Sequence, residues 1–266
     1  MSSDLLGPEI DAGPVLGAAA RLGPYFAWQP WDGESGWRPL AELLELDVIS
    51  ERVEVGRQTL ALMSGLTRAD IGEREAASII FLGLVSRLLS PVLAAAVVGD
   101  ALPIPEQDRM WWRPVAGGPI PIAVRGLAAA DCAGRDAVTI AQALTRTTVR
   151  GLVEPIVEVF RRRFALSPQV LWGNVSSALG GAAGMIADGV PGHAERSAAI
   201  VAQMLSLAPL DGTAALVRPD PERARWFLVR NNCCLYYRIP GGGTCGDCVL
   251  TPDEVRRQQW QAVLSR

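Results

Sequence analysis

The sequence predicts a mainly helical fold with a minor β component (α+β), in which a helical body precedes a small C-terminal module. Two observations carry this prediction. Apolar residues recur at helical spacing along much of the chain, and four of the five cysteines lie within sixteen positions near the C-terminus. The chain has 266 residues, of which 49% are hydrophobic, so it can bury a sizeable core. We expect a body over residues 1–224 and a module over residues 225–266.

The N-terminal part begins with 37 residues rich in glycine, proline and tryptophan, where we expect one helix over 14–22. Helical spacing then starts, because Ile49, Val53, Leu60 and Met63 fall on one stripe. The residues from Thr67 to Asp70 have the form of a capping box and predict the start of a further helix.

Residues 76–99 are apolar enough to require a membrane test. Arg87 is their only charge, and about 20 apolar residues can span a bilayer. Arg87 lies near the middle, however, where insertion costs about 3 kcal/mol, and Pro91 follows four residues later. The segment therefore predicts a buried pair of helices, over 79–89 and 91–98, broken at Pro91.

The next segment, 101–123, changes character, because its five prolines forbid a helix and favour loops and short strands. Helices are expected again over 138–149 and 156–163. Ser167 is a suitable N-cap, with Pro168 in the first helical position, for a helix to about residue 187. Another helix is expected over 194–205.

The C-terminal region begins with an aromatic and β-branched run over 225–230, which predicts a strand leading into the cysteines. The last helix has the signals of a complete N-terminus. Thr251 is the expected cap, Pro252 takes the first position and Glu254 closes a capping box, while Leu250 and Val255 form a hydrophobic staple.

Charge and cysteine usage limit the function classes. The net charge is −3 and no basic run is longer than residues 161–163, which argues against nucleic acid as a partner. The start, Met1 to Asp4, lacks the basic and apolar regions of a signal peptide. A total of five cysteines, of which four are crowded together, is typical of a metal site in a reducing compartment. We therefore expect a soluble, cytoplasmic protein.

The four clustered cysteines, Cys233, Cys234, Cys245 and Cys248, follow the spacing C-C-x10-C-x2-C. Thiolates in such a group select zinc, copper(I) or an iron–sulfur cluster. Zinc sites usually use two C-x2-C pairs, whereas adjacent cysteines in an extended chain point to opposite faces. A two-iron cluster accommodates such a spread pair more easily, although a zinc site stays open on spacing alone.

The remaining cysteine and the single histidine are not expected to take part in a metal or catalytic site. Cys132 is isolated and is expected to be a small structural thiol. His193, the single histidine, is expected at the surface, and a Rieske-type cluster needs two histidines.

The cysteine pattern resembles the C-terminal motif of the FhuF-like ferric-siderophore reductases, in which four cysteines bind a [2Fe-2S] cluster. Three further stretches are similar to parts of that family: Ala77-Ser78 through Pro91, Trp111-Trp112-Arg113-Pro114 with Gly117-Gly118-Pro119, and Leu171-Trp172-Gly173-Asn174. The resemblance covers most of the chain from about residue 40, but only the cysteine motif is diagnostic.

The resemblance implies an enzyme that reduces iron(III) in a hydroxamate-type siderophore by one electron, releasing iron(II) in the cytoplasm or at the inner face of the membrane. Gly180 to Gly184 lie inside a helical pattern and do not form a nucleotide-binding loop, so we expect an external donor, a reductase or a ferredoxin. Two alternatives stay open: a non-enzymatic iron–sulfur electron carrier or regulator, and a zinc-stabilised siderophore-binding protein.

Contacts with the siderophore are expected from an aromatic platform, although core packing is the competing interpretation for the tryptophans. Arg238 lies between the two cysteine pairs, and we expect its charge to raise the cluster's potential. The candidate substrate-binding residues are Trp111, Trp112, Trp172, Tyr236, Tyr237 and Arg238.

Overall fold

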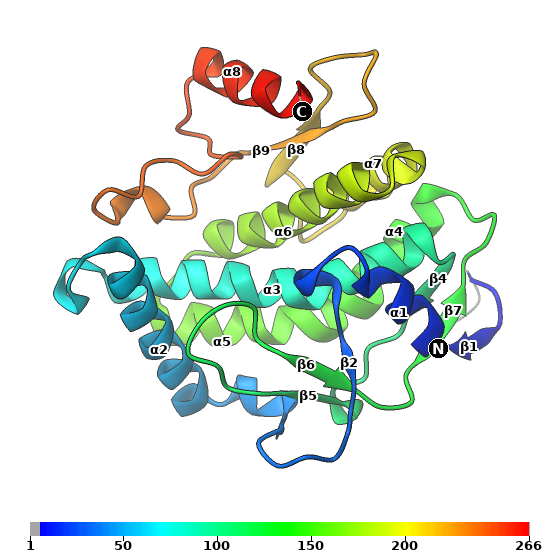
Figure 1. Ribbon diagram of the computed structural model, residues 1–266, viewed down its shortest axis with the longest axis horizontal. Helices are drawn as coiled ribbons and strands as arrows, with labels where there is room; N and C mark the ends of the chain where they lie inside the picture. The colour runs from blue at the N-terminus through cyan, green and yellow to red at the C-terminus, as the bar shows by residue number, and fades with distance from the viewer. Residues whose placement is uncertain (1–5, 266) are drawn as a thin grey trace.

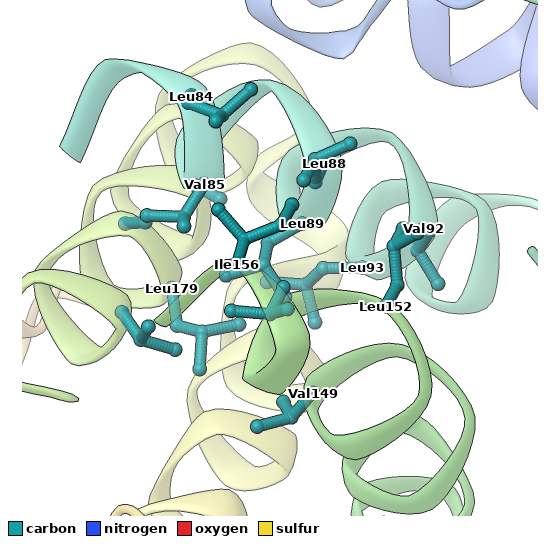
Figure 2. Packing of buried hydrophobic residues seen from close by; sticks show 14 of the residues in the cluster. Leu84, Val85, Leu88, Leu89, Val92, Leu93, Val149, Leu152, Ile156 and Leu179 are labelled. Atoms are coloured by element: carbon teal, nitrogen blue, oxygen red, sulfur yellow. The ribbon is translucent and has the colours of Figure 1, made fainter. Parts of the chain in front are cut away.

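In the computed structural model of the protein, which describes residues 6–265, helix α3 (Glu73–Val98) runs through the centre of the helical body (Figure 1). Helix α6 (Pro168–Gly189) packs along it. The apolar side chains of α3 and α6 that face each other form the core, together with apolar residues of the helical segment 145–164. Figure 2 shows Leu89 of α3, Leu152 of that segment and Leu179 of α6 in this core. The signal-peptide expectation concerns Met1 to Asp4 and lies outside the described residues.

The other helices confirm the predicted mainly helical fold. They are α1 (Gly13–Ala20), α2 (Leu46–Ser64), α4 (Ala137–Leu144), α5 (Glu154–Phe164), α7 (Ala194–Met204) and α8 (Asp253–Leu264).

The predicted break at Pro91 is wrong, because α3 continues through it as one helix. A proline inside a helix has no N–H for the carbonyl four residues earlier, here that of Arg87. The indole Nε1 of Trp28 donates to this carbonyl at 2.9 Å. A residue from the N-terminal segment thus replaces the missing hydrogen bond and lets the helix continue.

The side chain of Arg87 is buried at the same place, with 3% exposure. Its guanidinium donates to the carbonyls of Pro24, Ala27 (2.7 Å) and Ile120 (2.8 Å). Burial lowers the pKa of Arg87 to about 10, which leaves the group charged at neutral pH. Arg87, the only charged residue of the apolar segment, therefore links the segments around Pro24 and Ile120 to helix α3.

Two helices, α3 and α6, are long and apolar enough to cross a membrane. Within their most apolar windows, 72% of α3 and 67% of α6 is buried inside the protein. This burial is what the core helices of a soluble protein show, and the fold is compatible with a soluble protein.

Short strands form three small sheets around the helices. The strands predicted for the proline-rich segment 101–123 belong to the first two of these sheets. The first sheet has the order β1-β7-β4 and the second β2-β6-β5-β3, with β2 and β6 parallel and the other pairs antiparallel. The third is an antiparallel hairpin, β8-β9. The strands are β1 (Glu9–Asp11), β2 (Gln29–Pro30), β3 (Arg38–Pro39), β4 (Ala101–Pro103), β5 (Met110–Trp112), β6 (Ile122–Val124), β7 (Ala128–Asp131), β8 (Ala214–Val217) and β9 (Phe227–Arg230).

Local helix signals have mixed outcomes. Ser167 caps α6 as predicted, since its Oγ accepts from the N–H of Val170 at 3.3 Å. The expected gap between helices after residue 149 is wrong, because a π-helical segment (Thr145–Val153) joins α4 to α5. The capping box of Thr67 opens only a single 3₁₀ turn, Arg68–Asp70, and α3 begins later.

The predicted cap of the last helix is also wrong. Helix α8 begins at Asp253, and no side chain caps it. Thr251 is buried, and its hydroxyl bonds that of Thr244 at 3.0 Å, so it closes the cysteine loop instead. Leu250 and Val255, the residues of the predicted staple, are 50% and 42% exposed, and a contact between them stays a prediction.

The hairpin of β8 and β9 leads into the cysteines and packs on α6. The predicted boundary at residue 225 falls inside this hairpin, so β8 precedes it and β9 follows it. The division into two domains stays a prediction. Figure 1 shows the segment after β9 and helix α8 on one side of the helical body, with β5 and β6 on the opposite side.

Candidate metal centre

The segment that enters the cysteine run is held against helix α6 and the turn before β8. The backbone N–H of Asn231 donates to the carbonyl of Thr213 at 2.9 Å, and its side chain donates to that of Gly212 at 2.9 Å. The Asn232 side chain donates to the carbonyl of Gln169 at the start of α6. Gly173 is required at this contact, because a Cβ there would lie 2.1 Å from the Asn232 amide.

One vicinal cysteine contacts one cysteine of the C-x2-C turn, because the Sγ atoms of Cys234 and Cys245 are 3.6 Å apart. Burial raises the pKa of Cys233, and the neighbouring Cys234 and Cys248 act in the same direction. Among residues 6–265, no three His, Cys, Asp or Glu side chains converge as ligands of a single ion.

Two backbone N–H groups point at cysteine sulfurs, and hydrogen bonds of this kind are one of the factors that set the potential of an iron–sulfur cluster. Leu235 donates to Cys233 Sγ at 3.3 Å, and Leu250 donates to Cys248 Sγ at 3.4 Å. Leu235 has a left-handed backbone, with φ of 70°, which turns the chain directly after the vicinal pair.

The electrostatics of the site favour thiolate at Cys234. The hydrogen bond from the Cys245 thiol lowers the pKa of Cys234, and the Arg230 guanidinium acts in the same direction. The fifth cysteine differs, because burial raises the pKa of Cys132 to about 11 and its Sγ faces the carbonyl of Ala96 at 3.7 Å. Thiolate is the metal-binding form, so Cys234 is the cysteine best prepared to bind a metal, whereas the hydrogen bond to Cys234 raises the pKa of Cys245. Cys132 is a buried thiol in the core.

The cysteine site reaches the surface of the protein. Cys234 and Cys248 are 3% and 1% exposed, whereas Cys233 and Cys245 are half-buried. Cys234 and Cys248 therefore lie on the side of the site that packs against the helical body, and Cys233 and Cys245 lie on the side that is accessible to a partner in solution.

A polar network that the sequence analysis missed connects the site to the two central helices. The hydroxyl of Ser78 in α3 donates to the carbonyl of Cys234 at 2.7 Å. The amide of Asn174 in α6 donates to the Ser78 carbonyl at 2.9 Å, and its oxygen accepts from Arg230. Ser78 and Asn174 stand in two stretches that resemble the family, which was the only available signal for them.

The structure places three of the six predicted substrate-binding residues in the cysteine segment, where Tyr236, Tyr237 and Arg238 form a 3₁₀ turn between the cysteine pairs. Trp172 lies in α6, half-buried and packed against the hydrophobic core. Their role in substrate binding stays a prediction.

The other two, Trp111 and Trp112, lie in β5 on the opposite side of the body (Figure 1). Trp112 is fully buried, with Arg38 over its ring at 5.0 Å, and Trp111 stacks on Trp31 at 4.7 Å. The core interpretation therefore describes Trp112.

A groove of about 350 Å³ opens beside the C-x2-C turn. Gly246 and Asp247 of that turn line it, together with glycines of α6. Three aromatic residues that were not predicted as substrate contacts also line it, namely Trp226, Phe227 and Trp260. An apolar cavity of about 240 Å³ lies between α2, α3 and residues 116–120, but no cysteine lines it.

Comparison with known proteins assigns the cysteine segment. Residues 230–250 match the family model described as the FhuF 2Fe-2S C-terminal domain. This range contains Arg230 and all four clustered cysteines. A search of curated proteins gave no match to the chain. The chain thus carries the C-terminal 2Fe-2S domain of FhuF-like proteins, and its cofactor is a [2Fe-2S] cluster.

Proposed function

We propose that the protein is a ferric-siderophore reductase, with Cys233, Cys234, Cys245 and Cys248 as the cluster ligands. The observation that carries the proposal is a 2Fe-2S domain in which two of the four cysteines are half-buried rather than buried, next to a groove that is large enough to admit part of a bulky chelate. When bound, the cluster supplies a one-electron couple. The proposed reaction is the one-electron reduction of iron(III) to iron(II) in a hydroxamate chelate.

The release of iron follows from coordination chemistry. Hydroxamates are hard oxygen donors that hold iron(III) far more tightly than iron(II), so the gain of one electron loosens the chelate. An external donor, a reductase or a ferredoxin, loses the corresponding electron. The protein's own task is to bring the chelate close to the exposed side of the site, and this task needs no general base or nucleophile.

The groove beside Gly246 is the proposed place of approach. The rings of Trp226 and Trp260 and the guanidinium of Arg225 line it, which suits a large chelate with an apolar surface and oxygen acceptors. Tyr237, 43% exposed, and Arg238 lie on the cysteine turn itself. We place the reaction in the cytoplasm, in solution or at the inner face of the membrane.

Reoxidation by a ferric chelate tests this function. Protein reduced anaerobically and freed of excess reductant is mixed with ferrioxamine, with a ferrous-specific chelator present. We expect the visible absorption of the oxidised cluster to return, with one iron(II) trapped per reduced cluster. The gallium(III) complex of the same siderophore is the control, because it has the same shape but accepts no electron, and it should leave the protein reduced.

The opposite result would identify an electron carrier or regulator. In that case ferricyanide would restore the absorption, which shows an active cluster, while ferrioxamine would restore none of it.

A further inference from the structure

Arg230 is the most deeply buried charge close to the cysteines. It is the last residue of β9, three positions before Cys233, and its side chain is 0% exposed. An arginine is retained in such a place only when it is paired and hydrogen-bonded, because burying an unpaired charge costs several kcal/mol. The acceptors around its guanidinium therefore indicate what the residue is for.

Two of its three nitrogens have partners within the protein. Nε forms a salt bridge with Oδ2 of Asp247 at 2.9 Å, and Nη1 donates to Oδ1 of Asn174 at 2.6 Å. Nη2 is buried and has no hydrogen-bond partner in the described part of the chain. One edge of a fully buried guanidinium thus lacks an acceptor.

The hydrogen bonds around Arg230 show where that acceptor belongs. The backbone N–H of Arg230 also donates to the carbonyl of Asp247 at 3.0 Å, and Asp247 lies between Cys245 and Cys248. Asn174 donates to the Ser78 hydroxyl at 3.0 Å, and that hydroxyl donates to the carbonyl of Cys234 at 2.7 Å. Arg230 is thus tied on one side to the C-x2-C turn and on the other to Cys234, and the charges of Asp247, Cys234 and Cys245 raise its pKa against the effect of burial.

We propose that Arg230 is the buried counter-cation of the cluster, with its free Nη2 donating a hydrogen bond to a sulfur at the Cys234–Cys245 side and raising the reduction potential. Reduction adds negative charge to a cluster, so a fixed cation and an N–H donor beside its sulfurs stabilise the reduced form. Little solvent screens this interaction, because Arg230 is buried. The proposal rests on the cofactor and not on the reductase function.

The expectation that Arg238 tunes the potential is weakened by its position. Its side chain is 53% exposed and pairs with Glu75 at 3.5 Å and with the Tyr237 hydroxyl at 3.2 Å. Solvent screens an exposed charge. Asn174 and Ser78, by contrast, hold Arg230 and the Cys234 carbonyl in one buried network, which fixes the guanidinium relative to the cysteines.

Measuring the midpoint potential of Arg230→Gln and Arg238→Gln by anaerobic spectroelectrochemical titration tests the proposal. Both changes remove one positive charge, so they form a matched pair. We expect Arg230→Gln to reduce the equilibrium constant for reduction at least about tenfold, a fall of about 59 mV, and Arg238→Gln to leave it within about threefold. Arg230→Lys keeps the positive charge but loses the planar set of guanidinium donors. Its midpoint potential should lie between those of the wild-type protein and Arg230→Gln.

A second variant keeps the test decisive if Arg230→Gln does not assemble a cluster. Asp247→Asn preserves the shape of the salt-bridge partner but removes the charge that neutralises Arg230. We expect it to raise the potential, with the EPR signal of the reduced cluster retained. Equal shifts in the two arginine variants, an unchanged potential in a fully loaded Arg230→Gln protein, or no rise in Asp247→Asn would overturn the proposal, since a purely structural arginine would affect stability alone.

Discussion

Replacing Cys234 by serine should yield protein that has lost most of its iron and its visible absorption. The cysteine is 3% exposed, its sulfur lies 3.6 Å from that of Cys245, and Arg230 favours its thiolate form. A serine hydroxyl stays protonated at neutral pH and is a poor ligand for iron in a sulfur site. Anaerobic purification followed by iron analysis and absorption spectroscopy measures the loss.

The matched control is Cys132→Ser, which makes the same chemical change at an equally buried cysteine. This thiol lies against Ala96, away from the clustered cysteines, and burial raises its pKa. We expect wild-type iron content in this variant, with at most a modest loss of stability. If both serine variants lost iron to the same extent, general destabilisation would explain the result and the assignment of Cys234 as a ligand would fail.

Replacing Arg87 by methionine should lower the free energy of unfolding by at least about 3 kcal/mol. The change keeps much of the side-chain volume but removes all the donors to the carbonyls of Pro24, Ala27 and Ile120. Each hydrogen bond from a charged group contributes about 1.5–3 kcal/mol to stability. Urea denaturation followed by far-ultraviolet circular dichroism measures the change.

Arg74→Met is the control for this prediction, since Arg74 is an exposed residue in the first turn of the same helix. Surface substitutions usually change stability by less than about 0.5 kcal/mol. An Arg87→Met protein as stable as the Arg74→Met protein would contradict the anchoring role of the buried guanidinium.

The parts of the fold that depend on local chemistry could be predicted from the sequence. The Ser167 cap and the strand before the cysteines each depend on residues that are only a few positions apart in the sequence. The cysteine motif is likewise confined to a short segment. The break predicted at Pro91 was wrong because its compensation comes from Trp28, which is 59 residues away from the carbonyl it bonds. No local pattern reveals a donor at that distance.

The same limit applies to the candidate site. The four cysteines were found because they lie within sixteen residues, whereas Arg230 acts through Asn174, 56 residues earlier in the chain. The sequence placed the tuning charge at Arg238 because that residue lies between the cysteine pairs. The structure shows that burial, not proximity in the sequence, distinguishes the two arginines.

The metal content of the anaerobically purified protein, together with its EPR spectrum before and after reduction, tests whether the four cysteines hold a [2Fe-2S] cluster. We predict two irons and two sulfides per chain, a coloured and EPR-silent oxidised form, and a signal that appears on addition of one electron. A colourless protein that contains one zinc ion per chain and gives no signal would contradict electron transfer and would leave only the helical scaffold.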